Sequence, residues 1–296
     1  LIGDSGYTNW DTGQGLVSNG PGQPWLGLKL STGKWHDYHG NNEFLDGVCS
    51  DTESACDCDG NVLDECGVCG GSGPAENFTC DGIFKPVTKS ALQSATTLWH
   101  TDKATALSTY GEINTWHTSL ITNMSHLLQH GQFNEDISDW DVSNVTDMSW
   151  MFYGAASFNQ DLSSWDVSNV TNMFSMFRSC QSFNGDISTW DVSSVTDISW
   201  MFHSAFNFNQ DLSSWDVSSV TTTTHMFDNA PSFNGDISSW DVSSLTDVRA
   251  MFYGANNFNG DISSWDVSNV TNMNGMFTSA SSFNGDISSW DVSSVT

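Results

Sequence analysis

The sequence predicts an α/β solenoid, meaning an elongated stack of similar coils, and three observations support this prediction. A 25-residue unit recurs from Phe133 to the end of the 296-residue chain without insertion or deletion. Each unit carries one tryptophan, one stretch with strand character and one with helix character. A unit this short cannot bury its apolar side alone, so the copies must gain a core by stacking. The expected tryptophan column is Trp140, Trp165, Trp190, Trp215, Trp240, Trp265 and Trp290.

Composition limits the partners of the protein. The chain has 7 basic and 35 acidic residues, for a net charge of -28, so nucleic acid and anionic membrane surfaces would be repelled. Cations and polysaccharides remain as partners. No apolar run approaches the roughly 18 residues that span a bilayer, and no signal peptide is present. The sequence begins at Leu1 and stops in mid-unit at Thr296, which predicts that both ends are cuts in a longer protein.

Residues 1–50 form the first predicted segment, with Asn9-Trp10, then Trp35-His36-Asp37, then a closing Val48-Cys49. This order resembles the C-terminal half of a C-type lectin-like domain. The resemblance implies a calcium-held sugar and a partner for Cys49 outside this chain. Here, however, His36 replaces a ligand asparagine of that family, and only Asp37 and Gln14 remain as ligands, which disfavours sugar binding by that route. The alternative is a spacer module whose aromatic residues are core.

Residues 51–84 form a linker rich in cysteine, aspartate and glycine. Cysteine clustering of this kind is typical of secreted proteins, so we expect an extracellular or cell-surface location and disulfides. A zinc site of four thiolates is the alternative, and the pairing stays open. The disulfide candidates are Cys49, Cys56, Cys58, Cys66, Cys69 and Cys80.

The linker also has the alternating oxygen ligands of a calcium loop, because odd positions of a tight turn point at a common centre. A solvated turn is the equally weighted alternative. No other cofactor is expected. The candidate ligands are Asp57, Asp59, Asn61 and Asp64.

Residues 85–111 predict a helical cap on the first coil. Leu92, Ala95, Leu98 and Trp99 have helical spacing, and a terminal coil needs such a cover because its outer side would otherwise expose core side chains. The repeats then occupy 112–296, starting with a degenerate unit in which Trp116 lies 24 residues before Trp140.

Within one unit, residues 162–167 predict a short strand that pairs with its copies above and below. Thr171 predicts a helix N-cap, followed by Met173, Met176 and Phe177 on one helical face. Residues that tolerate the left-handed conformation should end that helix in every unit. These are Gly154, Ser179, Ser204, Asn229, Gly254 and Ser279.

One strand and one short helix per coil is the leucine-rich-repeat plan. The motif Phe-Asn-x-Asp-Ile/Leu-Ser-x-Trp-Asp-Val-Ser-x-Val-Thr closely resembles the BspA-like repeats of bacterial and mycoplasma-type surface proteins, and the match covers residues 90–296. That resemblance implies an extracellular leucine-rich-repeat-like solenoid used for adhesion or surface architecture, with no catalytic residues.

Identical residues should form columns about 4.8 Å apart along the stack. The Phe, Trp and Met columns predict core, Cys180 predicts a small buried thiol, and an asparagine column that includes Asn159 predicts an amide ladder between side chains. Two aspartate columns need compensation for repulsion of about 1 kcal/mol per neighbouring pair in water. Asx-turns to backbone N–H groups are one solution, and cations bridging successive coils are the other. The columns begin at Asp136 and Asp141 and recur every 25 residues.

Several asparagines lie in glycosylation sequons, although serine replaces some of their repeat equivalents, so the asparagine could also be only a turn residue. Asn77, in the linker, is the best candidate. The sequon residues are Asn77, Asn123, Asn144, Asn169 and Asn269.

The sequence contains no catalytic motif, so we expect no enzyme. The first functional hypothesis is an extracellular structural or adhesive repeat protein, a subunit of a surface layer, fibre or hair-like filament that associates with itself or with other matrix and surface proteins. The second is an adhesin that binds carbohydrate or a host protein through the lectin-like segment and a face of the stack. Near-uniform units favour the first.

Overall fold

The computed structural model describes residues 16–18, 26–29, 35–39, 43–45 and 61–296, and it divides into two units, 1–76 and 77–296. In the first unit, four strands form an antiparallel sheet in the order β1-β2-β3-β4. Their bounds are β1 Leu16–Ser18, β2 Leu26–Lys29, β3 Trp35–His39 and β4 Glu43–Leu45. Asp37 lies on β3, opposite Gly27 of β2 and Leu45 of β4. Gln14 lies outside the described residues.

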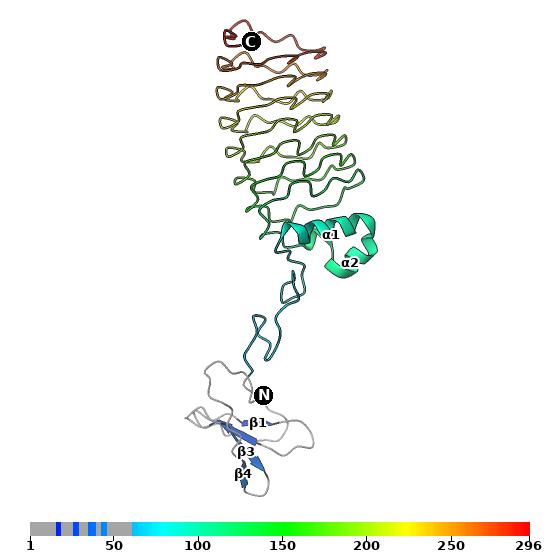
Figure 1. The fold of residues 1–296 in the computed structure, drawn as a ribbon, viewed down its shortest axis with the longest axis vertical. Coiled ribbons are helices and arrows are strands. Elements are labelled where there is room, and N and C mark those ends of the chain that lie inside the picture. Colours follow the sequence, from blue (N-terminus) through cyan, green and yellow to red (C-terminus); the bar gives the residue numbers. More distant parts are fainter. Residues whose placement is uncertain (1–15, 19–25, 30–34, 40–42, 46–60) are drawn as a thin grey trace. The chain divides into compact units, whose positions relative to one another are not determined.

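The second unit begins its regular structure with two helices in the segment for which the sequence predicts a cap. Helix α1 spans Lys89–Thr101 and α2 spans Lys103–Tyr110 (Figure 1). Asp102 ends α1 and also caps α2, because its side chain accepts the N–H of Thr105. The two helices therefore meet at one residue, and a 3-10 turn, η1 (Ile113–Thr115), follows them.

Helix α1 covers the first coil with its apolar side. Leu92, Ala95 and Trp99 are buried, and the ring of Trp99 packs edge-on against Trp116 at a centroid distance of 5.7 Å. The Nζ of Lys89 donates to the Oδ1 of Asn123 at 2.6 Å. The helix is thus fixed to the coil by core packing and by a polar contact at its first residue.

Above the cap, successive units lie one over another as a stack of coils (Figure 1). Backbone N–H groups of alternate residues donate to carbonyls of the next coil, as Met173 does to Asp197 and Phe177 does to Met201. A single parallel bridge links each coil to the next, in the column Asn123, Asp147, Asn172, Asp197, Thr222, Asp247 and Asn272. We call this the bridge column.

The local structure of each coil differs from the expected strand and helix. Residues 116–296 contain neither, and turns take their place. At 162–167, the side chains of Asp161 and Asp166 accept the N–H groups of Ser163 and Ser168, and these Asx-turns curl the segment that a strand would need extended. This corrects the strand prediction.

The expected helix after Thr171 is absent because alternate backbone N–H groups of this segment donate to carbonyls of the next coil. Met173 donates to the next coil, and Ser175 has a φ of 56°, which no right-handed helix accommodates. The positions expected to tolerate the left-handed conformation do adopt it, with φ between 54° and 74°, but they close turns and not a helix. They are Gly154, Ser179, Ser204, Asn229, Gly254 and Ser279.

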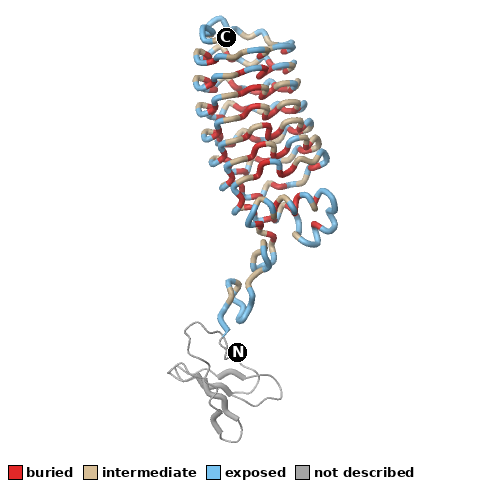
Figure 2. The backbone as a smooth tube through the Cα atoms, in the orientation of Figure 1, coloured by how far each residue is buried: buried red, intermediate tan, exposed pale blue. Residues whose placement is uncertain are grey.

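The core runs through the inside of the stack (Figure 2). Phe177 stacks on Phe202 of the next coil at 5.8 Å and on Phe183 of its own coil at 4.0 Å. Six of the seven column tryptophans are buried, and Trp290 is partly buried. Each indole N–H donates to a carbonyl of the preceding coil, such as Trp190 to Leu162 at 2.9 Å. The buried indole N–H of every column tryptophan is thereby satisfied, whereas that of Trp99 in the cap has no partner.

Candidate functional site

The aspartate columns are built from Asx-turns. Every aspartate of both columns accepts the N–H of the serine two residues later, at 2.9 to 3.1 Å. In many coils the serine hydroxyl adds a second bond, as Ser193 does to Asp191 at 2.6 Å. The Ser193 hydroxyl and N–H hold the pKa of Asp191 below its usual value, and the neighbouring Asp166 opposes this. The turns thus offset the repulsion along the column.

The two aspartate columns do not form a metal site in the described part of the chain. No group of three or more His, Cys, Asp or Glu side chains within residues 61–296 is arranged to hold a metal ion. In the linker, the carboxylate of Asp64 accepts three backbone N–H groups, from Cys66, Val68 and Gly73, which lower its pKa. The carboxylate of Asp64 therefore stabilises the backbone of this loop. Two of the other expected calcium ligands, Asp57 and Asp59, lie outside the described residues.

The linker cysteines that the structure describes are oxidised. Cys66, Cys69 and Cys80 are each disulfide-bonded, as the sequence predicts, while Cys49, Cys56 and Cys58 lie outside the described residues. Thiols in disulfides cannot serve as zinc thiolates, so the zinc alternative is excluded for these three.

Cys180 is free and buried. Its Sγ donates to the carbonyl of Phe152, and burial raises the pKa of the thiol far above its usual value. Such a thiol is core, and it stands where other coils have alanine.

The asparagines of the stack serve as connectors between coils. In the asparagine column, the side-chain Oδ1 of each residue accepts the backbone N–H of its equivalent one coil later. Asn159, for example, accepts the N–H of Asn184 at 2.8 Å. This corrects the expected side-chain amide ladder, because the donor is the backbone. The sequon residues Asn144, Asn169 and Asn269 donate their amide N–H to carbonyls of the preceding coil.

The two remaining sequon residues also make hydrogen bonds. Asn123 donates to Asp147 and accepts from Lys89, while the side-chain carbonyl of Asn77 accepts the N–H of Val87. Glycosylation stays a prediction at all five sequons. Asn77 keeps its rank as the best acceptor because its amide N–H is not donated to another coil.

Sequence reasoning missed the alternation in the bridge column. Acidic residues there are separated by neutral ones, so no two carboxylates are neighbours, and Asn272 donates to Asp247 at 3.2 Å. The signal was present in the sequence as residues 147, 172, 197, 222, 247 and 272, which read D, N, D, T, D and N.

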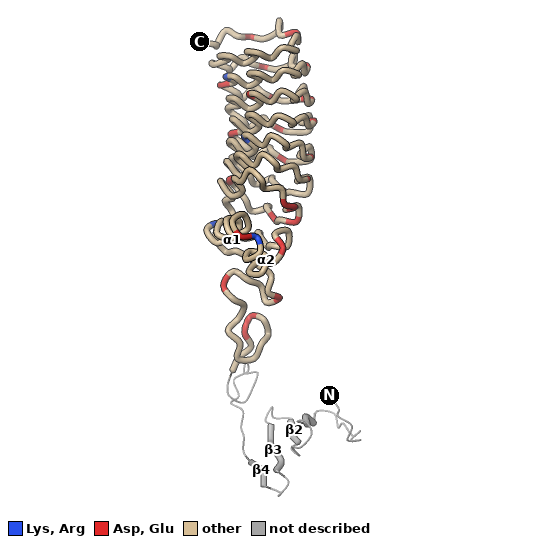
Figure 3. Tube along the Cα trace, turned by 90° about the vertical axis from the view of Figure 1, so that its right-hand side faces the viewer, with Lys and Arg blue, Asp and Glu red and all other residues tan. Residues whose placement is uncertain are grey.

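One face of the stack departs from the repeat. Each coil contributes to it the turn that follows the bridge column, where the side chains differ from unit to unit. We call it the variable face and define it by Trp150, Tyr153, Phe174, Arg178, Trp200, His203, His225, Asp228, Arg249 and Tyr253. The stack contains few basic residues among its many acidic ones (Figure 3), and both of its arginines lie on this face.

Aromatic and basic groups alternate along the variable face. The guanidinium carbon of Arg178 lies 5.6 Å from the ring centre of Trp150 and 4.4 Å from that of Trp200, whose coils flank its own. Ser175 occupies the position of these tryptophans in the intervening coil, so no third indole stands between Trp150 and Trp200. The ring of His225 stacks on the far side of Trp200 at 3.9 Å.

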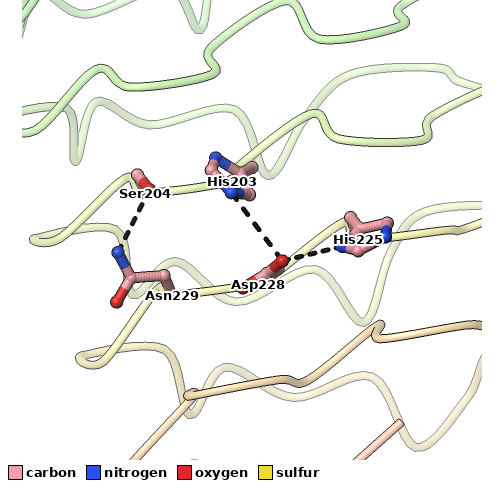
Figure 4. Close-up of polar contacts among 5 residues, drawn as sticks. All are labelled: His203, Ser204, His225, Asp228 and Asn229. Atoms are coloured by element: carbon pink, nitrogen blue, oxygen red, sulfur yellow. Dashed lines mark hydrogen bonds and ion pairs between the residues drawn. The ribbon is translucent and has the colours of Figure 1, made fainter. Parts of the chain in front are cut away.

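Asp228 joins two histidines of this face (Figure 4). Its Oδ2 lies 2.7 Å from the Nδ1 of His225 and 3.7 Å from the Nε2 of His203 in the preceding coil. Burial is the main cause that lowers the pKa of His203, with Arg178 and His225 acting in the same direction against Asp228. Asp228 thus makes one hydrogen bond and one longer contact with two histidines of successive coils.

None of the helices in the described residues is long and apolar enough to cross a lipid bilayer. No curated protein matches the chain. No solved structure matches it either.

The repeats match the model of one protein family. That family is described as "Mycoplasma protein of unknown function, DUF285", and the matches fall on residues 90–215, 162–258 and 234–296. Together they cover all of the stack and most of the cap, well over half of the sequence. The chain is a member of this DUF285 family of mycoplasma proteins of unknown function.

Proposed function

We propose that this chain is an extracellular structural or adhesive repeat protein without catalytic activity, a subunit of a surface layer, fibre or hair-like filament. The repetition of one hydrogen-bonding pattern from coil to coil carries this proposal. Trp165, Trp190 and Trp215 make the same bond to the preceding coil, at 2.9 to 3.1 Å. A surface that repeats at a fixed spacing can meet another copy at many equivalent registers, which suits lateral packing.

The described cysteines support the extracellular part of the proposal. Disulfides at Cys66, Cys69 and Cys80 persist in oxidising surroundings. We propose with it that the stack is a leucine-rich-repeat-like solenoid and that residues 1–50 are a lectin-like module. These two assignments rest on the motifs of the sequence.

The acidic columns set the conditions for assembly. Copies with a net charge of -28 repel one another at low ionic strength, and salt or divalent cations would screen the exposed aspartates. We therefore expect association to depend on calcium or on high salt. The partners are other copies of this chain or other matrix and surface proteins.

Negative-stain electron microscopy tests the proposal. Purified protein should form filaments or sheets in calcium or high salt and disperse when the cation is chelated or the salt removed. A matched variant replaces Asp191, Asp216 and Asp241 by asparagine, which keeps the Asx-turn acceptor but removes three charges. Its assembly should need less cation. Dispersed particles under all these conditions would refute the structural role.

A further inference from the structure

Arg178 is an uncompensated cation in an acidic protein. A guanidinium carries five N–H donors, yet it forms no hydrogen bond or ion pair through its side chain with any residue in the described part of the chain. Its guanidinium carbon lies over the rings of Trp150, Tyr153 and Trp200, at 4.4 to 5.7 Å from the ring centres. Asp228, the acidic residue of the same face, is already engaged by His203 and His225.

The ring contacts prepare this guanidinium for an anion. Rings on its flanks remove water and limit its rotamers, while the N–H fork keeps its capacity for two parallel bonds to a carboxylate. A charge-assisted bond in such a partly dry site is stronger than the same bond in open water. The side chain is half-buried, so the fork is held and still accessible.

Tyr153 beside Arg178 offers a surface to a sugar ring, whereas the faces of Trp150 and Trp200 are covered by the guanidinium and by neighbouring histidine rings. Tyr153 is 38% exposed and packs edge-on against Trp150 at 4.9 Å, which presents an amphipathic surface next to the cation. The C–H face of a pyranose is apolar and its hydroxyls are polar, so it suits such a surface. Three coils span about 10 Å, the length of one or two sugar rings.

The charge of the protein restricts the ligand further. A long polyanion would be repelled by the acidic columns, whereas a ligand with one carboxylate would meet a single cation. A carboxylate on an acidic peptide would use the fork but would leave the aromatic surface without a matched ring. The observations thus favour a sugar that carries one carboxylate.

We propose that Arg178, held between Trp150 and Trp200, forms with Tyr153 a binding site for a carboxylated sugar residue of the uronic acid type. The site goes beyond the proposed structural role, because lateral packing of coils requires no ligand. It gives the variable face a function of its own, independent of the assembly of the rods.

The chain offers a direct probe of this site, because Arg178 and Arg249 are its only two arginines. Protein labelled with ¹⁵N-arginine should therefore give two Nε–H signals in an NMR spectrum. We expect sodium glucuronate to shift the Arg178 signal in a saturable way and to leave the Arg249 signal in place. Glucose, sodium chloride and sodium acetate at matched ionic strength are the comparison ligands. Acetate should bind at least about tenfold more weakly than glucuronate, because it lacks the ring.

Two variants complete the test. Arg178→Lys keeps the charge but removes the planar fork, and we expect it to weaken glucuronate binding by about tenfold or more. Arg249→Lys is the matched control on the same face and should bind as the unaltered protein does. Thermal unfolding of both variants shows whether the stack is intact, and Tyr153→Ala tests the ring in a protein that keeps Arg178.

Several outcomes would overturn the proposal. Equal shifts of both arginine signals would indicate general ionic effects, and equal binding of acetate and glucuronate would show that the rings contribute nothing. Binding of an acidic peptide in preference to glucuronate would assign the site to protein recognition. An unshifted Arg178 signal at 50-fold excess over the protein would rule out the site, while filament formation would remain unaffected and would test the structural role separately.

Discussion

The indole Nε1–H of Trp190 donates to the main-chain carbonyl of Leu162 in the preceding coil, at 2.9 Å, and both groups are buried. This bond joins two coils from inside the core, where water cannot replace it. The same relationship recurs at every column tryptophan, down to Trp290 and Ile262 at 3.1 Å.

Replacing Trp190 by phenylalanine should therefore destabilise the stack by about 1–3 kcal/mol, because it removes a buried hydrogen bond and leaves a cavity beside the carbonyl of Leu162, which keeps only the N–H of Trp165 as a donor. Urea unfolding monitored by circular dichroism, with amide hydrogen exchange to locate the opened coils, measures the effect. Trp290→Phe is the control. Because Trp290 is only partly buried, this substitution should lower the free energy of unfolding by less. Equal losses at the two positions would contradict the argument.

Gly185 should not tolerate alanine. A Cβ there would collide with the carbonyl oxygen of Gln160 in the preceding coil. At Gly285 the nearest backbone oxygen, that of Gly260, would lie 3.7 Å away, although both sites place a phenylalanine ring atom at 3.0 Å from the new Cβ. Gly185→Ala should cost about 1–3 kcal/mol more than Gly285→Ala in thermal or urea unfolding. Similar stabilities of the two variants would show that the backbone moves aside.

Acid should destabilise the stack. The hydroxyl and N–H of the following serine lower the pKa of Asp166, Asp191 and Asp241 from the ordinary 3.8. A carboxyl with a depressed folded-state pKa adds stability that is present above the unfolded-state pKa and is lost as the pH falls through the folded-state value. The melting temperature should therefore fall as the pH is lowered below about 4.

A pair of variants in one coil isolates this effect. Ser193→Ala removes the hydroxyl that bonds Asp191 at 2.6 Å, so the fall in melting temperature with acid should become smaller. Ser194→Ala changes an exposed neighbour and should leave the acid response unaltered. A melting temperature that stays constant from pH 5 to pH 2.5 would show that the Asx-turns do not make the stability of the stack depend on pH.

Cys180 should be inert in the folded protein. Burial raises the pKa of its thiol, and its Sγ donates to the carbonyl of Phe152 at 2.9 Å, so neither thiolate nor access is available to an alkylating reagent. Mass spectrometry after treatment with iodoacetamide should find the Cys180 peptide unmodified without urea and modified in urea. Cys180→Ala should change stability by less than about 1.5 kcal/mol, because the equivalent residues of other coils are alanine. Rapid labelling of the native protein would show that the coil opens.

The sequence predicts the stacking partners more fully than the backbone within one coil. Burial of Phe177, Val170 and Trp190 follows from apolar residues that recur at one phase of a fixed period. The same period suits both a helix and a series of turns, and short segments carry too little propensity to decide between them. Ser175 illustrates this, since its left-handed φ depends on hydrogen bonds to the next coil and not on its own preference.

The candidate site was harder to predict. Variation at Tyr153, Arg178 and His203 marks the variable face in the sequence alone, but the insertion of Arg178 between Trp150 and Trp200 does not appear there. That contact joins Arg178 with one residue in each neighbouring coil, and Arg178 lies three positions after Ser175, the repeat equivalent of Trp150 and Trp200. Only the fold of the turn after Ser175 brings the guanidinium into line with the rings.

The bridge column has a consequence for how this protein can grow. Because Asp147, Asp197 and Asp247 alternate with neutral residues, the unit of electrostatic repetition is two coils, or 50 residues, although the unit of packing is one. Removing a single coil with a neutral bridge residue, such as Asn172, would bring two carboxylates side by side, whereas removing two adjacent coils would keep the alternation. Chains of this type should therefore lose a pair of coils, or one coil with an acidic bridge residue, more easily than one coil with a neutral bridge residue.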